Sequence, residues 1–265
     1  IKDFSLKEDL QYFAGIKNKI NFGLNITHHT FSPGDFQTSA TSSYNPLTIQ
    51  NKFALDAAAY ISDEWTFSKK LKFNTGLRLS SFNVLGPGDF YTYDKNGNII
   101  DTATYSSGKI VKSYWNLQPR FAGTYQLNTF SSIKISYSRN VQNLHLLSNS
   151  TGSNPTDLWI SSSNNVKPEI SDQVSTGYYR NLRQNQYEFS AEIYYKYLQN
   201  QIDYRNGAQL VANEYVESQL LYGIGKAYGL ELYAKKKYGR LTGWISYTLS
   251  RTELQINGIN DDLWY

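Results

Sequence analysis

The chain has 265 residues, with 26 basic and 22 acidic side chains and no cysteine. Its mean hydropathy is −0.52, and no apolar run approaches the roughly 20 residues of a membrane-spanning helix, so a helical membrane protein is excluded. The lack of cysteine excludes a disulfide-stapled fold and a thiolate metal site. The charges are spread along the chain rather than gathered in a block, so we expect no nucleic-acid partner.

Alternation of apolar and polar residues predicts ten β-strands, arranged as five hairpins. Successive side chains of a strand face opposite sides of the sheet, so an apolar residue at every second position marks one apolar face. The expected hairpins join residues 5–13 with 19–27, 52–62 with 71–81, 115–127 with 132–140, 171–182 with 186–198, and 226–237 with 241–250. In the last strand, LTGWISYTLS, Leu241, Ile245 and Tyr247 point one way, and Trp244 and Ser246 point the other.

The connections differ in length between the two ends of these hairpins. Within each hairpin the turn is short, whereas segments of about twenty residues, rich in turn formers, join one hairpin to the next. These long segments are 31–50, 86–109, 148–169 and 205–225. Short periplasmic turns and long extracellular loops are the plan of bacterial outer-membrane barrels. Strands of about nine to thirteen residues are also long enough to cross a bilayer at a tilt of ~45°.

The pattern therefore predicts an all-β, antiparallel transmembrane β-barrel whose apolar face meets lipid. The polar face would line a wet lumen with Arg78, Arg120, Glu188, Glu192 and Glu231. Tyrosine, tryptophan and phenylalanine near the strand ends fit the aromatic girdles of such barrels. The alternative is a soluble all-β protein with its apolar face packed inward. It explains the alternation equally well but leaves the strand length and the loop asymmetry unexplained.

Motifs for catalysis or metal binding are weak. His28 and His29 face opposite sides of one strand without a suitably spaced third ligand, which favours an exposed strand end over a metal site. Glu188 and Glu192 share a face but lie about 13 Å apart along the strand, too far to act as a catalytic pair. We find no Ser-His-Asp or nucleophile-elbow pattern and place the remaining histidine, His145, at a strand-to-loop junction. We therefore expect no enzyme, no catalytic residue, no metal and no cofactor.

Three groups of residues give the chain a family resemblance. They are Pro119-Arg120 opening a strand, KPE at 167–169 followed by Asp172-Gln173, and AYGLEL at 227–232 followed by GW and SYTLSRTE. With these motifs, nearly the whole chain resembles the barrel of TonB-dependent outer-membrane receptors of Bacteroidetes. The resemblance implies a 22-stranded barrel, occluded by an N-terminal plug, that binds a scarce nutrient and imports it with energy from the TonB complex.

The chain departs from that family pattern in three respects. It has room for about ten strands, it shows no plug or TonB-box segment, and it ends at NDDLWY within another loop. We therefore treat residues 1–265 as a single, partial β-barrel region that contacts TonB only through a missing N-terminal region. Outer-membrane lipid is an expected partner, and a surface lipoprotein is a further one. The alternative function is a non-transporting outer-membrane barrel that serves as a scaffold or as a subunit of a surface assembly.

Candidate ligand contacts lie in the long segments. Aromatic rings stack on sugars, peptides or chelates, and amides form hydrogen bonds with them. The residues selected on this ground are Tyr91, Tyr93, Trp159, Asn164 and Tyr215. The expected ligand is a small molecule of one of three kinds: a glycan, a peptide or a metal chelate.

Overall fold

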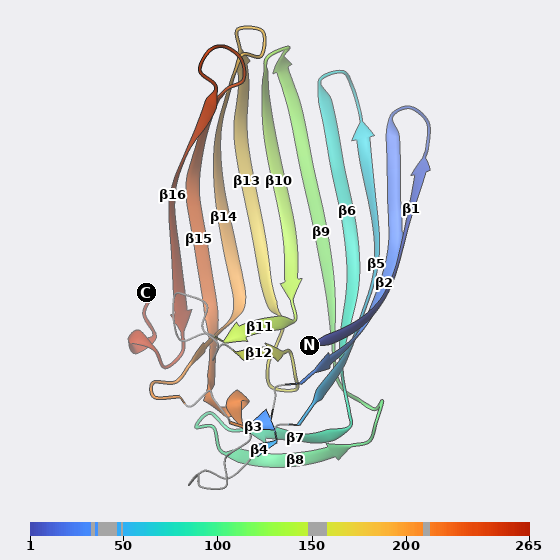
Figure 1. The fold of residues 1–265 in the computed structure, drawn as a ribbon, viewed down its shortest axis with the longest axis vertical. Helices are drawn as coiled ribbons and strands as arrows, with labels where there is room; N and C mark the ends of the chain where they lie inside the picture. The colour runs from blue at the N-terminus through green and yellow to red at the C-terminus, as the bar shows by residue number, and fades with distance from the viewer. Residues whose placement is uncertain (33–34, 37–46, 49, 148–157, 209–212) are drawn as a thin grey trace.

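The computed structural model describes the whole chain apart from residues 33–34, 37–46, 49, 148–157 and 209–212. Ten long strands form one antiparallel sheet in the order β1-β2-β5-β6-β9-β10-β13-β14-β15-β16 (Figure 1). Their bounds are Lys2–Phe13, Asn18–Phe31, Lys52–Thr66, Leu71–Leu85, Ile110–Asn128, Ser131–Gln142, Glu169–Leu182, Tyr187–Tyr204, Leu220–Lys236 and Gly243–Ile256. The ten strands and five tight hairpins predicted from the sequence are thus confirmed.

Most strands extend further than predicted at the end that carries the long connections, which we call the loop end. The opposite end, with the tight turns, is the short-turn end. For example, β14 continues to Tyr204 although its predicted limit was Leu198. The register of β14 against β15 shifts between Gln199 and Gln201, and Asn200 has a φ of 55°. This bulge interrupts the alternation of side chains, which is why the sequence pattern ended too early.

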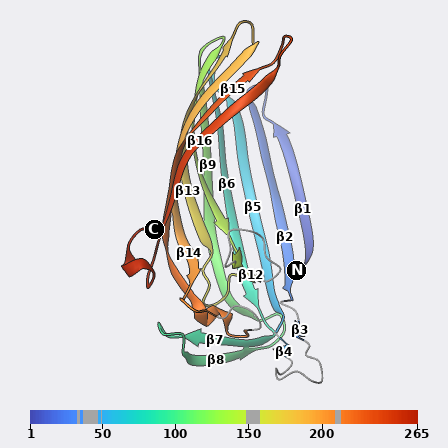
Figure 2. The ribbon, with the colours of Figure 1, turned by 60° about the vertical axis from the view of Figure 1, so that its left-hand side comes forward.

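The long connections contain structure of their own at the loop end (Figures 1 and 2). The small strands are β3 (Asp35–Phe36) with β4 (Leu47–Thr48), β7 (Gly88–Tyr93) with β8 (Ile99–Tyr105), and β11 (Leu144–Leu147) with β12 (Leu158–Ser161). Two short 3-10 helices follow, η1 (Val216–Gln219) and η2 (Asn260–Asp262). The predicted long segments that contain residues 37–46 and 148–157 lie partly outside the described residues.

Within the described part of the chain, no helix has the length and the apolarity needed to cross a membrane.

Cross-strand register gathers the apolar side chains on one face of the sheet. Residues paired across antiparallel strands share a face, and one such row runs from Ile193 through Leu230 to Leu249. Leu249 keeps 61% of its surface exposed and Ile193 keeps 54%. We call this side the apolar face. Such extensive exposure of large apolar side chains is expected where the surrounding medium is lipid.

The opposite side, the polar face, carries the predicted lumen residues. Glu192 pairs with Glu231, and Arg78 pairs with Tyr60 across the neighbouring strands. The same register places Arg120 and Glu188 on this face too. At the loop end, side chains of this face pack against the loop hairpin of β7 and β8. This core cluster consists of Phe31, Ala54, Phe82, Val84 and Phe90, with Tyr105 against it. The long connections therefore cover the polar face at the loop end.

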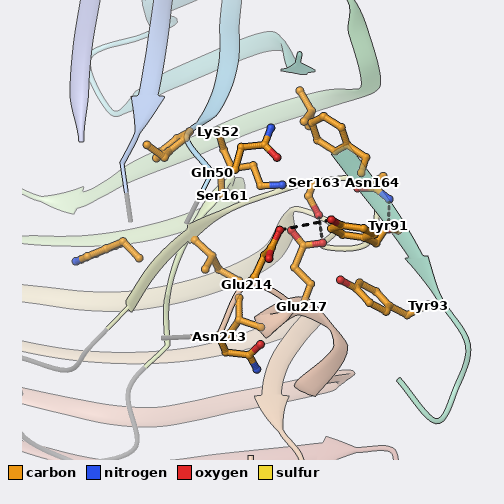
Figure 3. A pocket seen from close by; sticks show the side chains of 16 residues that line it. Gln50, Lys52, Tyr91, Tyr93, Ser161, Ser163, Asn164, Asn213, Glu214 and Glu217 are labelled. Atoms are coloured by element: carbon orange, nitrogen blue, oxygen red, sulfur yellow. Dashed lines mark hydrogen bonds between the residues drawn. The ribbon is translucent and has the colours of Figure 1, made fainter. Parts of the chain in front are cut away.

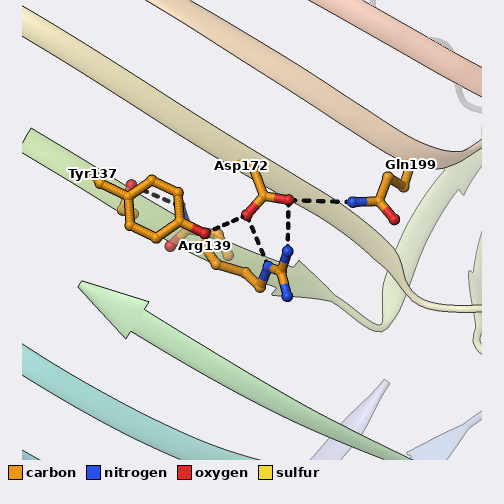
Figure 4. Close-up of polar contacts among 6 residues, drawn as sticks. Tyr137, Arg139, Asp172 and Gln199 are labelled. Atoms are coloured by element: carbon orange, nitrogen blue, oxygen red, sulfur yellow. Dashed lines mark hydrogen bonds and ion pairs between the residues drawn. The ribbon is translucent and has the colours of Figure 1, made fainter. Parts of the chain in front are cut away.

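A polar cluster crosses three strands on the apolar face near the loop end (Figure 4). The Asp172 carboxylate accepts hydrogen bonds from Arg139 Nε at 2.8 Å and Arg139 Nη2 at 2.9 Å. It also accepts one from Tyr137 Oη at 2.7 Å and one from Gln199 Nε2 at 3.2 Å. A bidentate guanidinium–carboxylate pair with two further donors fixes β10, β13 and β14 at the margin of the apolar surface.

Candidate functional site

A pocket lies at the loop end of the polar face (Figure 3). Wall strands contribute Phe31, Lys52 and Val84, and the remaining lining comes from segments that fold over the wall. The cavity volume is about 70 Å³, and the pocket is open to solvent. Ligand pockets span roughly 300–1,000 Å³, so this space suits one group of a ligand that extends beyond the pocket.

The structure brings the five predicted contact residues together from three of the long segments. Tyr91, Tyr93, Trp159 and Asn164 line the pocket. Tyr215 is not part of the lining, but its ring meets that of Tyr91 edge-on with centroids 5.1 Å apart. Trp159 keeps 49% of its surface exposed, which leaves an indole available for stacking. These five residues form a shared site, while ligand binding to them stays a prediction.

A hydrogen-bond framework holds the cover of the pocket in place. The side-chain amides of Asn164 and Asn165 donate to the Tyr91 carbonyl at 2.7 and 2.9 Å. Asn165 Nδ2 also donates to Glu217 Oε2 at 2.7 Å, and Ser163 Oγ donates to the same oxygen at 2.9 Å. Glu217 therefore joins η1 to the segment after β12, and that segment in turn supports β7. The amide of Asn164, selected as a ligand contact, is occupied in positioning Tyr91.

The electrostatics of the pocket favour hydrogen-bond donation by its phenols. Burial raises the pKa of Tyr91, and the nearby Glu214 carboxylate raises it further. Burial likewise raises the pKa of Tyr93, with a second contribution from Glu217. Both phenols therefore remain protonated at neutral pH. The lining otherwise offers the carboxylates of Glu214 and Glu217 against one ammonium, that of Lys52, which lies 4.6 Å from the centroid of the Phe90 ring.

Several residues of the site have no signal in the sequence. Glu217 lies in a short YVESQ stretch that matches no motif, and Ser163 and Asn165 are two of many polar residues in their segment. Their roles depend on contacts between positions more than 50 residues apart, such as the 52 that separate Asn165 from Glu217. Only the folded chain reveals them.

Beneath the pocket, a serine, a histidine and a glutamate are aligned. His145 Nε2 lies 3.2 Å from Ser162 Oγ, and His145 Nδ1 lies 3.5 Å from Glu169 Oε1. This is the order of groups found in serine hydrolases. However, Ser162 is 0% exposed and His145 is 2% exposed, so no substrate reaches the hydroxyl. The cluster instead ties β11 to the segment after β12. The sequence prediction placed His145 at a strand-to-loop junction; it lies just after the end of β10, within the short strand β11, and it is buried.

The adjacent histidines are separated by the sheet. His29 Nδ1 lies 2.9 Å from Asp3 Oδ1 on the polar face, while His28 belongs to the apolar face through its register with Phe4 and Leu55. Within the described ranges, no group of three or more histidine, cysteine, aspartate or glutamate side chains is arranged to hold a metal ion.

Comparison with known proteins gives one family and a set of similar folds. Residues 2–264 match the family model described as TonB dependent receptor-like, beta-barrel. No curated protein sequence matches the chain. Among solved structures, the FrpB iron transporter from Neisseria meningitidis (F3-3 variant) is similar, with 17% identity and a TM-score of 0.63 over 96% of this chain and 36% of that one.

Two receptors of other bacteria show the same likeness. The closed form of the ferric-catecholate import receptor Fiu from E. coli K12 has 15% identity and a TM-score of 0.55, over 96% of this chain and 38% of that one. The alcaligin receptor FauA from Bordetella pertussis has 15% identity and a TM-score of 0.54, over 97% and 40%. At these identities the likeness concerns the fold. The chain spans 36 to 40% of the length of these three proteins.

Proposed function

Because this chain belongs to the TonB-dependent receptor β-barrel family, whose barrels lie in the outer membrane, we propose that it forms part of a receptor that captures a nutrient and imports it. The observation that carries this proposal is the pocket at the loop end. Three long segments converge there over the polar face, and two of them line the opening with the aromatic side chains of Tyr91, Tyr93 and Trp159. In outer-membrane barrels the long loops are extracellular, so the pocket would be the first contact for a ligand outside the cell.

The chemistry of the pocket narrows the proposed ligand. Phenol donors, an indole and amides suit a glycan, a peptide or a metal chelate. Among the described lining residues, the two carboxylates of Glu214 and Glu217 exceed the single ammonium of Lys52. Like charges repel strongly where water is partly excluded, so the part of the ligand that enters is proposed to be neutral or positively charged.

The remaining features of the proposal concern the intact receptor. Residues 1–265 would form one barrel region, completed by further strands of a 22-stranded wall, and energy would arrive from TonB through a region outside this chain. A surface lipoprotein partner and an origin in Bacteroidetes stay predictions that follow from the motifs at 119–120, 167–173 and 227–253.

Uptake by cells tests the proposal. A strain that lacks the full-length receptor would be compared with one that carries it, on a panel of glycans, peptides and metal chelates as sole nutrient sources. We expect uptake of one class to require both the receptor and TonB. If uptake of no nutrient source required both the receptor and TonB, the proposed import function would be wrong, and a scaffold role in a surface assembly would be favoured.

Paired variants connect uptake to the pocket. Tyr91→Ala combined with Tyr215→Ala removes two aromatic contacts and should lower uptake by about tenfold, because each ring interaction contributes ~0.5–1.5 kcal/mol. Tyr247→Ala, which removes a ring from the apolar face, is the matched control and should leave uptake unchanged.

A further inference from the structure

Cations gather on the apolar face at the short-turn end of β13, β14 and β15. The Arg183 guanidinium carbon lies 5.8 Å from the centroid of the Tyr187 ring, and the Lys236 ammonium lies 5.9 Å from it. Lys236 and Tyr187 are paired in the sheet register. Arg180, one row further toward the loop end, is exposed. Two cations thus flank the partly buried ring of Tyr187, and Arg180 lies in the next row of the same face.

In the part of the chain that the structure describes, these cations have no carboxylate partner. Within the described residues, none of Arg180, Arg183 and Lys236 forms an ion pair with a carboxylate. The neighbouring Lys237 differs, because its ammonium lies 2.9 Å from Glu188 Oε2. Among the described residues, therefore, no carboxylate serves as a counter-ion for Arg180, Arg183 or Lys236.

Other cations of the apolar face, near the loop end, have carboxylate partners. Arg139 pairs with Asp172 there, and Lys226 and Arg251 both pair with Glu253. Those three cations belong to the apolar face by register, as Lys236 does. Near the loop end of β10, β15 and β16 these cations therefore have carboxylate partners, whereas Arg183 and Lys236 at the short-turn end have none among the described residues.

A hollow extends from the cations toward the middle of the apolar face. Two adjoining spaces of about 350 and 360 Å³ share Phe189, Ala234 and Ile245 in their walls. The register explains the hollow, since Ala234 lies between Phe189 and Ile245 in one row. In the next row Ala191 lies beside Leu232. Alanines between larger side chains leave an apolar groove, and Lys236 lines its short-turn end.

We infer that this surface binds an anionic glycerophospholipid of the periplasmic leaflet. Arg183 and Lys236 bind the phosphate of the headgroup, and the groove over Ala234 and Ala191 holds an acyl chain. The short-turn end is periplasmic in this fold, and tyrosine is the residue expected at headgroup depth. Unpaired Lys and Arg near a membrane surface attract anionic lipid. The combination of a cationic rim and an apolar groove matches both parts of one lipid molecule.

Native mass spectrometry of the full-length receptor in detergent tests this inference. Phosphatidylglycerol and phosphatidylcholine with identical acyl chains would be titrated separately, and the dissociation constants compared. We expect phosphatidylglycerol to bind at least about tenfold more tightly than phosphatidylcholine. Two cations attract its net negative charge, whereas phosphatidylcholine has no net charge. Equal affinity of the two lipids in the unaltered receptor would overturn the inference without recourse to any variant.

Variants separate the headgroup contacts from the groove. Arg183→Gln with Lys236→Gln should abolish the preference for phosphatidylglycerol. Lys69→Gln with Lys70→Gln removes the same charge from the turn between β5 and β6 and should preserve it. Ala234→Trp fills the groove without a change of charge and should weaken the binding of both lipids.

Soluble glycerol phosphate distinguishes a lipid site from a simple phosphate site. It should not displace phosphatidylglycerol at equal concentration, because it lacks the acyl chain. Displacement by glycerol phosphate, or an unchanged preference in the Arg183→Gln/Lys236→Gln variant, would contradict a site built from both cations and groove.

Discussion

The wall of ten strands and the cover at the loop end are specified by different kinds of contact. In the wall, each side chain meets its partners through register, as Leu230 does with Ile193 and Leu249. In the cover, polar contacts join distant segments: Tyr91 is 73 residues from Asn164 and 123 from Glu214. The alternation of apolar and polar residues along each strand is therefore enough to specify the wall. The cover depends instead on specific pairs of hydrogen-bond donors and acceptors.

The largest expected effect tests the two faces of the wall. Leu249→Arg places a charge in the middle of the apolar face and should reduce the free energy of unfolding from lipid vesicles by ~2–4 kcal/mol. Thr248→Arg is the matched control on the adjacent position, where Glu231 faces it across the sheet. It should be tolerated or slightly stabilising. Equal losses for both variants would show that the two faces do not meet different media.

A smaller effect is expected where the wall uses polar contacts. Asp172→Ala removes the acceptor of four hydrogen bonds and leaves the Arg139 guanidinium uncompensated. Because Asp172 is partly exposed, we expect a loss of about 1–3 kcal/mol in the free energy of unfolding. Arg251→Ala, at a more exposed ion pair, should cost under ~0.5 kcal/mol. A loss for Arg251→Ala as large as that for Asp172→Ala would contradict this ranking.

The cover should respond locally rather than globally. Glu217→Ala leaves the donors of Ser163 and Asn165 without their shared acceptor. Hydrogen exchange in residues 158–166 should then accelerate by about tenfold, while exchange in the wall strands stays unchanged. Glu214→Ala, whose only described hydrogen bond is at 3.4 Å from Tyr91 Oη, is the control and should have little effect. Acceleration throughout the wall would mean that cover and wall unfold together.

The smallest effect concerns pH at the turn between β7 and β8. Hydrogen bonds from Asn98 hold the pKa of the Asp94 carboxyl below its ordinary value near 3.8. These bonds therefore support the turn above that pH, and the support is lost as pH falls through the lowered pKa. The protection factors of the Asn96 and Asn98 amides, which are corrected for the intrinsic pH dependence of exchange, should fall below about pH 4, and Asp94→Ala should show the lower protection already at pH 6. A turn that is equally protected at pH 3 and pH 6 would contradict the assignment.

The contrast between wall and cover also explains which parts of the structure could be predicted from the sequence. Alternation in stretches such as 241–250 was sufficient for the number, pairing and faces of the strands. It was insufficient at Asn200, where a bulge hides the continuation of β14. In the site, Tyr91 and Trp159 could be predicted because they are aromatic residues in long connecting segments. Glu217 could not be selected, because its role arises only from partners far along the chain.

The most direct test of the account is the environment of β16. Because this chain contains no cysteine, single cysteines can be placed at successive positions from 244 to 249 and labelled with a fluorophore in the full-length receptor in vesicles. We predict that a lipid-borne quencher acts at 245, 247 and 249, and that a water-soluble quencher acts at 244, 246 and 248. If positions 245, 247 and 249 were instead shielded from lipid, the apolar face would pack against protein, and the membrane barrel would be contradicted.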